Sequence, residues 1–139
     1  YKEYVFCGFG EPTLRLDALC AIGKELKKRG ATVRLNTNGQ GSMIAGRDIS
    51  PDLAQAVDKI NVSLNDASAE DYVTLCRPAY GKAAFEGLQD FAKKCASRGI
   101  LTWFSVVDII GEEKIAKCRE IAEKCGVTLR VRPFIKDSE

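Results

Sequence analysis

Apolar and polar residues alternate along this chain in two different periods, and the two periods follow each other in turn. Short runs rich in apolar and β-branched residues predict strands at residues 3–7, 32–36, 59–64, 101–108 and 127–131. Between them, apolar residues recur at helical spacing, which predicts helices over residues 14–29, 51–57, 82–98 and 112–125 and a further helix that begins at 68–71. Gly30, Gly99 and Gly126 directly follow the three longest helical patterns, as expected of residues that end a helix.

Local signals refine the shorter helices and the loop before them. Ser50 is expected to cap the helix over 51–57, because Pro51 then occupies its first position, where a missing N–H costs nothing. Ser68 is expected to cap the next helix, with Asp71 three residues further on. Residues 40–49 are rich in glycine and predict a surface loop.

The regular order of strand, helix and strand predicts an α/β fold with a parallel sheet, since a helix is the usual crossover between parallel strands. Residues 100–110 are almost uniformly apolar, as expected of a strand that is covered on both faces. Two architectures satisfy this pattern, a doubly wound open sheet and an arc of a (β/α) barrel. Periodicity does not choose between them.

Composition narrows the class of protein. The chain has 139 residues, which suits one compact unit, and its net charge of +2 is too small to indicate a nucleic-acid partner. No apolar run approaches the roughly 18 residues that would indicate a membrane span. Histidine is absent, which removes the commonest general base and metal ligand.

Six cysteines are present, and none forms a CxxC pair. Cys118 and Cys125 would lie about 10 Å apart along one helix, too far for a disulfide. We therefore expect most of the six to be buried free thiols, and such thiols suit a reducing compartment, which indicates a cytoplasmic protein.

Each predicted strand ends in glycine or polar residues. The residues in question are Gly8, Gly10, Glu11 and Pro12 after the first strand, Thr37, Asn38 and Gly39 after the second, Ser63 and Asn65 after the third, Asp108 after the fourth and Arg132 after the fifth. A single end of this kind is ordinary, because turns favour such residues. Five at the same edge of a parallel sheet predict a small-molecule site there.

These motifs together resemble the radical S-adenosylmethionine (SAM) superfamily, and within it the TatD-associated radical SAM subgroup. The similar stretches cover residues 5–15, 34–39, 46–49, 63–65, 75–78 and 130–132. Gly-Glu-Pro at 10–12 and Thr-Asn-Gly at 37–39 are the most characteristic of them. The resemblance implies a parallel-stranded partial (β/α)6 TIM-like barrel, of which this chain would form a truncated arc of about five βα units.

The resemblance also implies a role for each strand end. Gly8, Gly10, Glu11 and Pro12 would receive the amino group of the SAM methionine, with Thr37, Asn38 and Gly39 near the methionine moiety. Ser63 and Asn65 would meet the ribose, Asp108 would flank the adenine and Arg132 would close the site. The residues alone leave other roles open, a turn or helix cap for Ser63 and Asn65 and a cap of the following helix for Asp108.

One feature of the family is missing. Its [4Fe–4S] cluster is held by three cysteines in a CxxxCxxC loop, and no three cysteines of this chain have that spacing. We therefore expect residues 1–139 to be a radical SAM core fragment, from the second to the sixth barrel strand. The first strand, the cluster loop and the first helix would precede Tyr1. The full protein would cleave SAM reductively to a 5′-deoxyadenosyl radical, whereas this chain would hold neither a metal nor a catalytic residue and be inactive alone.

Two other classes of function stay open, a nucleotide-binding α/β transferase without iron and a non-catalytic regulatory or scaffolding relic of the fold. The substrate is not indicated. Because the strand around Val5 and the strand at 127–131 would be open sheet edges, we also expect copies of the chain to associate through them.

Overall fold

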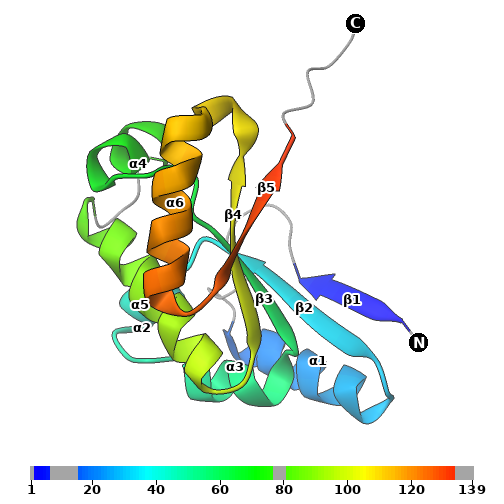
Figure 1. Cartoon of the computed structure of the whole chain (residues 1–139). Helices are drawn as coiled ribbons and strands as arrows, with labels where there is room; N and C mark the ends of the chain where they lie inside the picture. Colours follow the sequence, from blue (N-terminus) through cyan, green and yellow to red (C-terminus); the bar gives the residue numbers. More distant parts are fainter. Residues whose placement is uncertain (1, 7–15, 77–80, 134–139) are drawn as a thin grey trace, which may run out of the picture.

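A computed structural model describes residues 2–6, 16–76 and 81–133 of the chain. The strands are β1 (Glu3–Phe6), β2 (Thr32–Thr37), β3 (Lys59–Ser63), β4 (Leu101–Val107) and β5 (Thr128–Arg132). The helices are α1 (Leu16–Lys28), α2 (Gly41–Ala45), α3 (Ser50–Ala56), α4 (Ala69–Cys76), α5 (Ala83–Ser97) and α6 (Glu112–Cys125), with a 3-10 turn η2 (Asp108–Ile110) after β4. Strands and helices alternate as the sequence predicts (Figure 1).

The strand order decides between the two architectures. All neighbouring strands pair in parallel, and their order in the sheet, β1-β2-β3-β4-β5, is the order in the chain. A doubly wound sheet needs a point where this order reverses, so that helices cover both faces. Here α1 contacts α3, α3 contacts α5 and α5 contacts α6, in one helical layer on one side of the sheet (Figure 1). The fold is therefore an α/β arc of the TIM-like barrel kind, a partial barrel.

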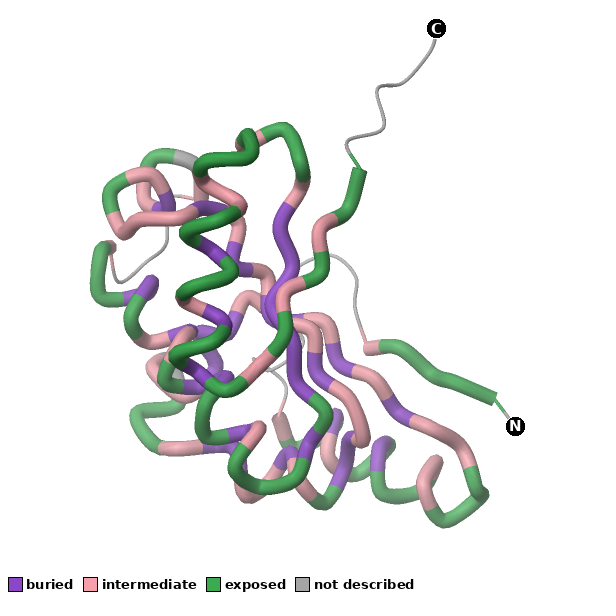
Figure 2. The backbone as a smooth tube through the Cα atoms, viewed as in Figure 1, coloured by how far each residue is buried: buried purple, intermediate pink, exposed green. Residues whose placement is uncertain are grey.

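The core lies between the sheet and this helical layer. Along β2 and β3 every second residue is buried, and the buried set is Val33, Leu35, Thr37, Ile60 and Val62 (Figure 2). α5 lies over the middle of the sheet and contributes Leu88, Phe91 and Ala92 to the same cluster. Exposure rises towards the two edge strands, β1 and β5 (Figure 2).

The predicted helix ends are confirmed. Gly30, Gly99 and Gly126 follow α1, α5 and α6 with φ of +81°, +84° and +74°, a region that glycine reaches without steric cost. The Ser68 hydroxyl accepts a hydrogen bond from the Asp71 N–H at 3.2 Å and so caps α4, as predicted.

Two local predictions are wrong. Ser50 is the first residue of α3 and Ile49 is its N-cap, because the Asp48 carboxylate already accepts the Ser50 N–H at 2.9 Å. The Ser50 hydroxyl accepts a hydrogen bond at 2.8 Å from Arg98 Nε at the end of α5 instead. The segment 40–49 contains the short helix α2, where a loop was predicted. Met43 of α2 fills the space that a Cβ atom at Gly87 of α5 would need, so a tertiary contact stabilises this helix.

The described cysteines are free thiols, as predicted. Cys95, Cys118 and Cys125 are buried, and Cys20 and Cys76 are half-buried, while Cys7 lies outside the described residues. Burial raises the pKa of Cys95 to about 12 and that of Cys118 to about 11. Within the described ranges, none of the helices has the length and apolar character that crossing a membrane requires.

Candidate functional site

The carboxyl ends of four neighbouring strands form the described part of the predicted site. Thr37, Ser63, Val107 and Arg132 are the last residues of β2, β3, β4 and β5. Since adjacent strands lie about 4.8 Å apart, β2 and β5 are separated by about 14 Å at this rim. A ligand that touches all of these ends must be extended. Gly8, Gly10, Glu11 and Pro12 lie outside the described residues.

The Thr-Asn-Gly motif forms a tight turn after β2. Thr37 Oγ1 accepts a hydrogen bond from the Gly39 N–H at 3.0 Å, and Asn38 Oδ1 accepts one from the Gln40 N–H at 2.9 Å. Gly39 has a φ of +78°, and a Cβ atom there would come within 2.7 Å of Leu88 Cβ. Glycine is thus required by the backbone and by the close approach of α5.

Asn65 has the most unusual backbone at the rim. Among the described residues it alone combines a side chain with a positive φ, of +68°. Its Nδ2 donates a hydrogen bond to Cys76 Sγ at 3.2 Å, which ties the loop after β3 to the end of α4. Burial raises the pKa of the Cys76 thiol, and this hydrogen bond acts in the opposite direction. Backbone outliers of this kind cluster at functional sites.

A charged cluster next to Asn65 was not found from the sequence. Asp66 is only 6% exposed, and Lys114 Nζ lies 3.2 Å from Asp66 Oδ1 and 3.2 Å from Asp71 Oδ2. The pKa of Asp71 is lowered most by a hydrogen bond from Lys114 and next by one from the Ser68 hydroxyl. The pKa of Lys114 is raised by the hydrogen bonds that it donates to Asp66 and Asp71. Asp66 and Lys114 are 48 residues apart, so only the fold joins the loop after β3 to α6.

Asp108 and Arg132 lie at the other end of the rim. Asp108 is exposed and is the first residue of η2, while the N-cap of α6 is Gly111. The alternative in which Asp108 caps α6 is therefore wrong. Arg132 is exposed and pairs in register with Val107.

The sheet face turned away from the helices carries further polar residues. Alternation along the strands puts on this open face Glu3, Val5, Thr32, Arg34, Asn36, Lys59, Asn61, Ser63, Leu101, Trp103, Ser105, Val107, Thr128, Arg130 and Arg132. Asn36, Asn61 and Trp103 stand directly side by side in register. The Arg130 guanidinium carbon lies 3.8 Å from the centre of the Trp103 ring, and Trp103 is only 3% exposed.

Three buried polar atoms in the described structure lack a hydrogen-bond partner, namely Arg34 Nε, Asn36 Oδ1 and Asn61 Oδ1. All three belong to the open face. Sequence reasoning did not single these residues out, although each is a polar residue at an alternating position inside a predicted strand. That position was a usable signal, because a strand with two apolar faces would not carry it.

The described residues do not fit an iron–sulfur cluster. Within residues 2–6, 16–76 and 81–133, no three Cys, Asp or Glu side chains gather closely enough to hold a metal ion. Cluster ligands are thiolates, whereas burial keeps Cys95 and Cys118 protonated.

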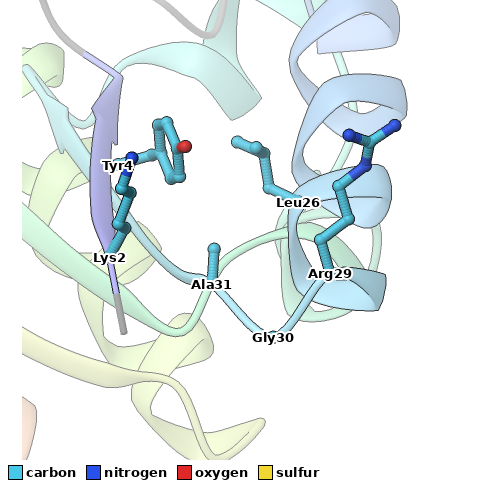
Figure 3. Close-up of a pocket in the computed structure, with 6 residues that line it drawn as sticks. All are labelled: Lys2, Tyr4, Leu26, Arg29, Gly30 and Ala31. Atoms are coloured by element: carbon cyan, nitrogen blue, oxygen red, sulfur yellow. The ribbon is translucent and has the colours of Figure 1, made fainter.

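Two cavities of the described structure lie away from the rim. One, of about 330 Å³, lies between the beginning of β1 and the last turn of α1, where Tyr4 and Leu26 point towards each other (Figure 3). Tyr4 and Val5 are 42% and 37% exposed on this edge strand, and association through it stays a prediction. The other, of about 270 Å³, lies beside Cys20, Arg47 and Asp52 on the outer side of α1 and α3.

Comparisons with known proteins bear on the fold. No protein-family model matches the sequence, and no curated protein matches it. A similar solved structure is a domain of pyruvate-formate lyase-activating enzyme from Bacteroides vulgatus ATCC 8482, with a TM-score of 0.66 and 13% identity. The similarity covers 94% of this chain and 99% of that one. At this identity the likeness shows a shared fold.

Proposed function

We propose that this chain is the SAM-binding part of a radical SAM enzyme. The observation that carries the proposal is the rim, where polar residues end or directly follow successive parallel strands of the arc and span about 14 Å. The motifs at these strand ends and the similarity in fold to a domain of a pyruvate-formate lyase-activating enzyme, a radical SAM activity, support it. Membership of the TatD-associated subgroup is part of the proposal.

An extended nucleoside with an amino-acid tail suits such a rim. Glu11 would supply the negative charge for the SAM ammonium group, since charge-assisted hydrogen bonds are the stronger kind. Asn38 and Gly39 would meet the methionine, and Ser63 and Asn65 would offer hydroxyl and carboxamide groups to the ribose. Asp108 and Arg132 would flank the adenine end. The Asn65 side chain is held in place by Cys76, which pre-organises it for this contact.

The cluster needs residues that the chain does not supply. The missing CxxxCxxC motif and the buried, protonated thiols favour cluster ligands that precede Tyr1. Residues 1–139 would then be the second to sixth strands of a six-stranded arc. When bound, such a cluster supplies the electron for reductive cleavage of SAM, and this chain would be inactive without it.

Binding of SAM tests the proposal directly. NMR titration of the chain with millimolar SAM should shift resonances at the rim. Asn65→Gly tolerates the positive φ and removes the side chain together with its hydrogen bond to Cys76. Combined with Ser63→Ala it should weaken binding about tenfold or more for two lost hydrogen bonds. Glu11→Gln should weaken it by about tenfold or more. Gln55→Ala, exposed on α3 and remote from the rim, is the control.

Other outcomes would support the competing classes. Tighter binding of ATP than of SAM would favour a nucleotide-binding transferase. No rim shifts with either ligand would favour a relic without a working site. Anaerobic reconstitution with iron and sulfide should yield no cluster, and about four irons per chain with a cluster absorption band would contradict the fragment hypothesis.

A further inference from the structure

Apart from its residues at the rim, such as Ser63 and Arg132, the open face of the sheet holds groups that a SAM site would not use. In the described strands this face carries four cationic residues, which are Arg34, Lys59, Arg130 and Arg132, and one carboxylate, Glu3. Glu3 lies 3.7 Å from Arg34 NH1 and 3.1 Å from Lys59 Nζ, so its single negative charge offsets part of the positive charge on β2 and β3. The face therefore has a net positive charge, and its two cations on β5 form no ion pair with a carboxylate of the described residues.

Arg130 is the better placed of the two cations on β5. It pairs in register with Ser105 and lies against the Trp103 ring at 3.8 Å, and no carboxylate of the described residues forms an ion pair with it. Stacking on an aromatic face orients a guanidinium group while leaving its N–H donors available. An orientated, unpaired guanidinium group is suited to bind a carboxylate or phosphate group.

In the described structure, the middle of the same face holds buried polar atoms without a hydrogen-bond partner, one of which is the donor Nε of Arg34. The Oδ1 atoms of Asn36 and Asn61 are buried without a partner and stand side by side across β2 and β3. An unsatisfied buried acceptor costs about 1–3 kcal/mol, and such groups commonly mark the position of a missing water or ligand. Rotation of either carboxamide exchanges its acceptor and donor ends, so each can turn towards a ligand.

We infer that the open face binds a small organic anion that also carries hydrogen-bond donors, such as a hydroxylated carboxylate or phosphate ester. Its anionic group would bind Arg130, and its hydroxyl or amino groups would donate to Asn36 and Asn61. The Arg130 backbone is two strands away from Asn61 and two residues further along the sheet, but its guanidinium group lies over Trp103, the register neighbour of Asn61. One small molecule can therefore contact both groups. The role of this anion as the substrate rests on the proposed function, with SAM at the rim above it.

The chain supplies its own reporter. Trp103 is its one tryptophan and lies beneath Arg130, so fluorescence reads this face alone. Glycerol 3-phosphate and citrate are the two organic anions used as probes. Inorganic phosphate, which lacks a carbon skeleton with donors, and glycerol, which lacks the charge, are the controls. We expect a saturable change with glycerol 3-phosphate or citrate, weaker binding of inorganic phosphate and no change with glycerol. Which of the two organic anions binds more tightly distinguishes a phosphate ester from a carboxylate.

Matched variants test the residues. Arg130→Gln should weaken binding of the organic anion about tenfold or more, whereas Arg119→Gln, which removes an equal charge from the exposed side of α6, should leave it unchanged. Asn61→Leu should weaken binding of the organic anion but not binding of inorganic phosphate. Melting temperatures of all variants identify any that fail to fold. The absence of a saturable change with both organic anions, or equal effects of Arg130→Gln and Arg119→Gln, overturns the inference.

A SAM titration separates this inference from the proposed function. We expect Arg130→Gln to bind SAM as the wild type does. If Arg130→Gln lost as much affinity for SAM as for the organic anion, Arg130 would bind the SAM carboxylate. That result overturns the substrate site and leaves the proposed function standing. Anion binding without SAM binding would support the anion site and overturn the radical SAM proposal.

Discussion

The two faces of the sheet differ in what they do with buried side chains. On the helix side, Leu35, Ile60 and Phe104 are fully buried in one apolar cluster. On the open face, Asn36 and Asn61 are held in the same strands with buried oxygens that have no partner. A fold under selection for stability alone would not keep them, since each unsatisfied group costs free energy. The helix side therefore stabilises the arc, and the open face is the one for which we propose a binding role.

The largest expected effect follows from truncation on the helix side. Phe104→Ala should lower the free energy of unfolding by about 3–5 kcal/mol, because it leaves a cavity beneath the helices. Leu101→Ala also truncates an apolar side chain of the same strand, a smaller one, but Leu101 is 54% exposed and on the open face. For this control, urea denaturation should show a loss of at most about 0.5 kcal/mol in the free energy of unfolding. Similar losses for both would break the comparison.

A second prediction concerns Gly39, where the rim turn meets α5. Gly39→Ala should destabilise the fold by about 2–4 kcal/mol, since the positive φ costs about 1–2 kcal/mol and the new Cβ would overlap Leu88. Gly30→Ala has a similar φ of +81° and open space around it. Gly30→Ala should therefore lose only the roughly 1–2 kcal/mol that the positive φ costs. Equal losses of stability for the two variants in thermal or urea denaturation would show that α5 moves away from the new Cβ atom and relieves the overlap.

A third prediction uses pH to probe the helix-side core. The pKa of Cys95 is raised by burial from 9.0 to about 12, so the folded state resists ionisation of this thiol. Its contribution to stability is complete below pH 9 and is lost as the pH rises towards 12, by roughly 1.4 kcal/mol per pH unit. Cys95→Ala should be less stable at pH 8 but should show a shallower decline between pH 9 and 11. Parallel curves for the two proteins would contradict the assignment.

The smallest expected effect is on the open face and has the opposite sign. Asn61→Leu removes a buried acceptor without a partner, so it should leave stability unchanged or raise it by up to about 1 kcal/mol. The mirror change on the helix side, Val62→Asn at the next residue, should cost several kcal/mol because it buries a new amide among apolar groups. Loss of stability in Asn61→Leu comparable to that in Val62→Asn would mean that both faces are packed alike.

Features that depend on neighbouring residues could mostly be predicted from the sequence, whereas features that depend on distant residues could not. Helix ends at Gly30, Gly99 and Gly126 and the cap at Ser68 depend on neighbours within a few residues, and all were predicted correctly. The helix within the segment 40–49 was not, because Met43 packs against Gly87, 44 residues away. Ser50 is an exception, since its N–H binds the carboxylate of Asp48, two residues before it. The candidate site divides in the same way. Residues at strand ends could be picked out by motif, whereas the cluster of Asp66, Asp71 and Lys114 could not.

The sequence by itself determined the α/β class, the order of the elements and the polar character of the strand ends, since these follow from periodicity and turn chemistry. Only the tertiary structure decided that the helices form one layer, because crossovers that all advance in one direction give an arc, and one reversal would give a doubly wound sheet. It also decided that Arg130 lies on Trp103 and that Asn36 stands beside Asn61. Strand register sets these neighbours, and register is a property of the whole sheet.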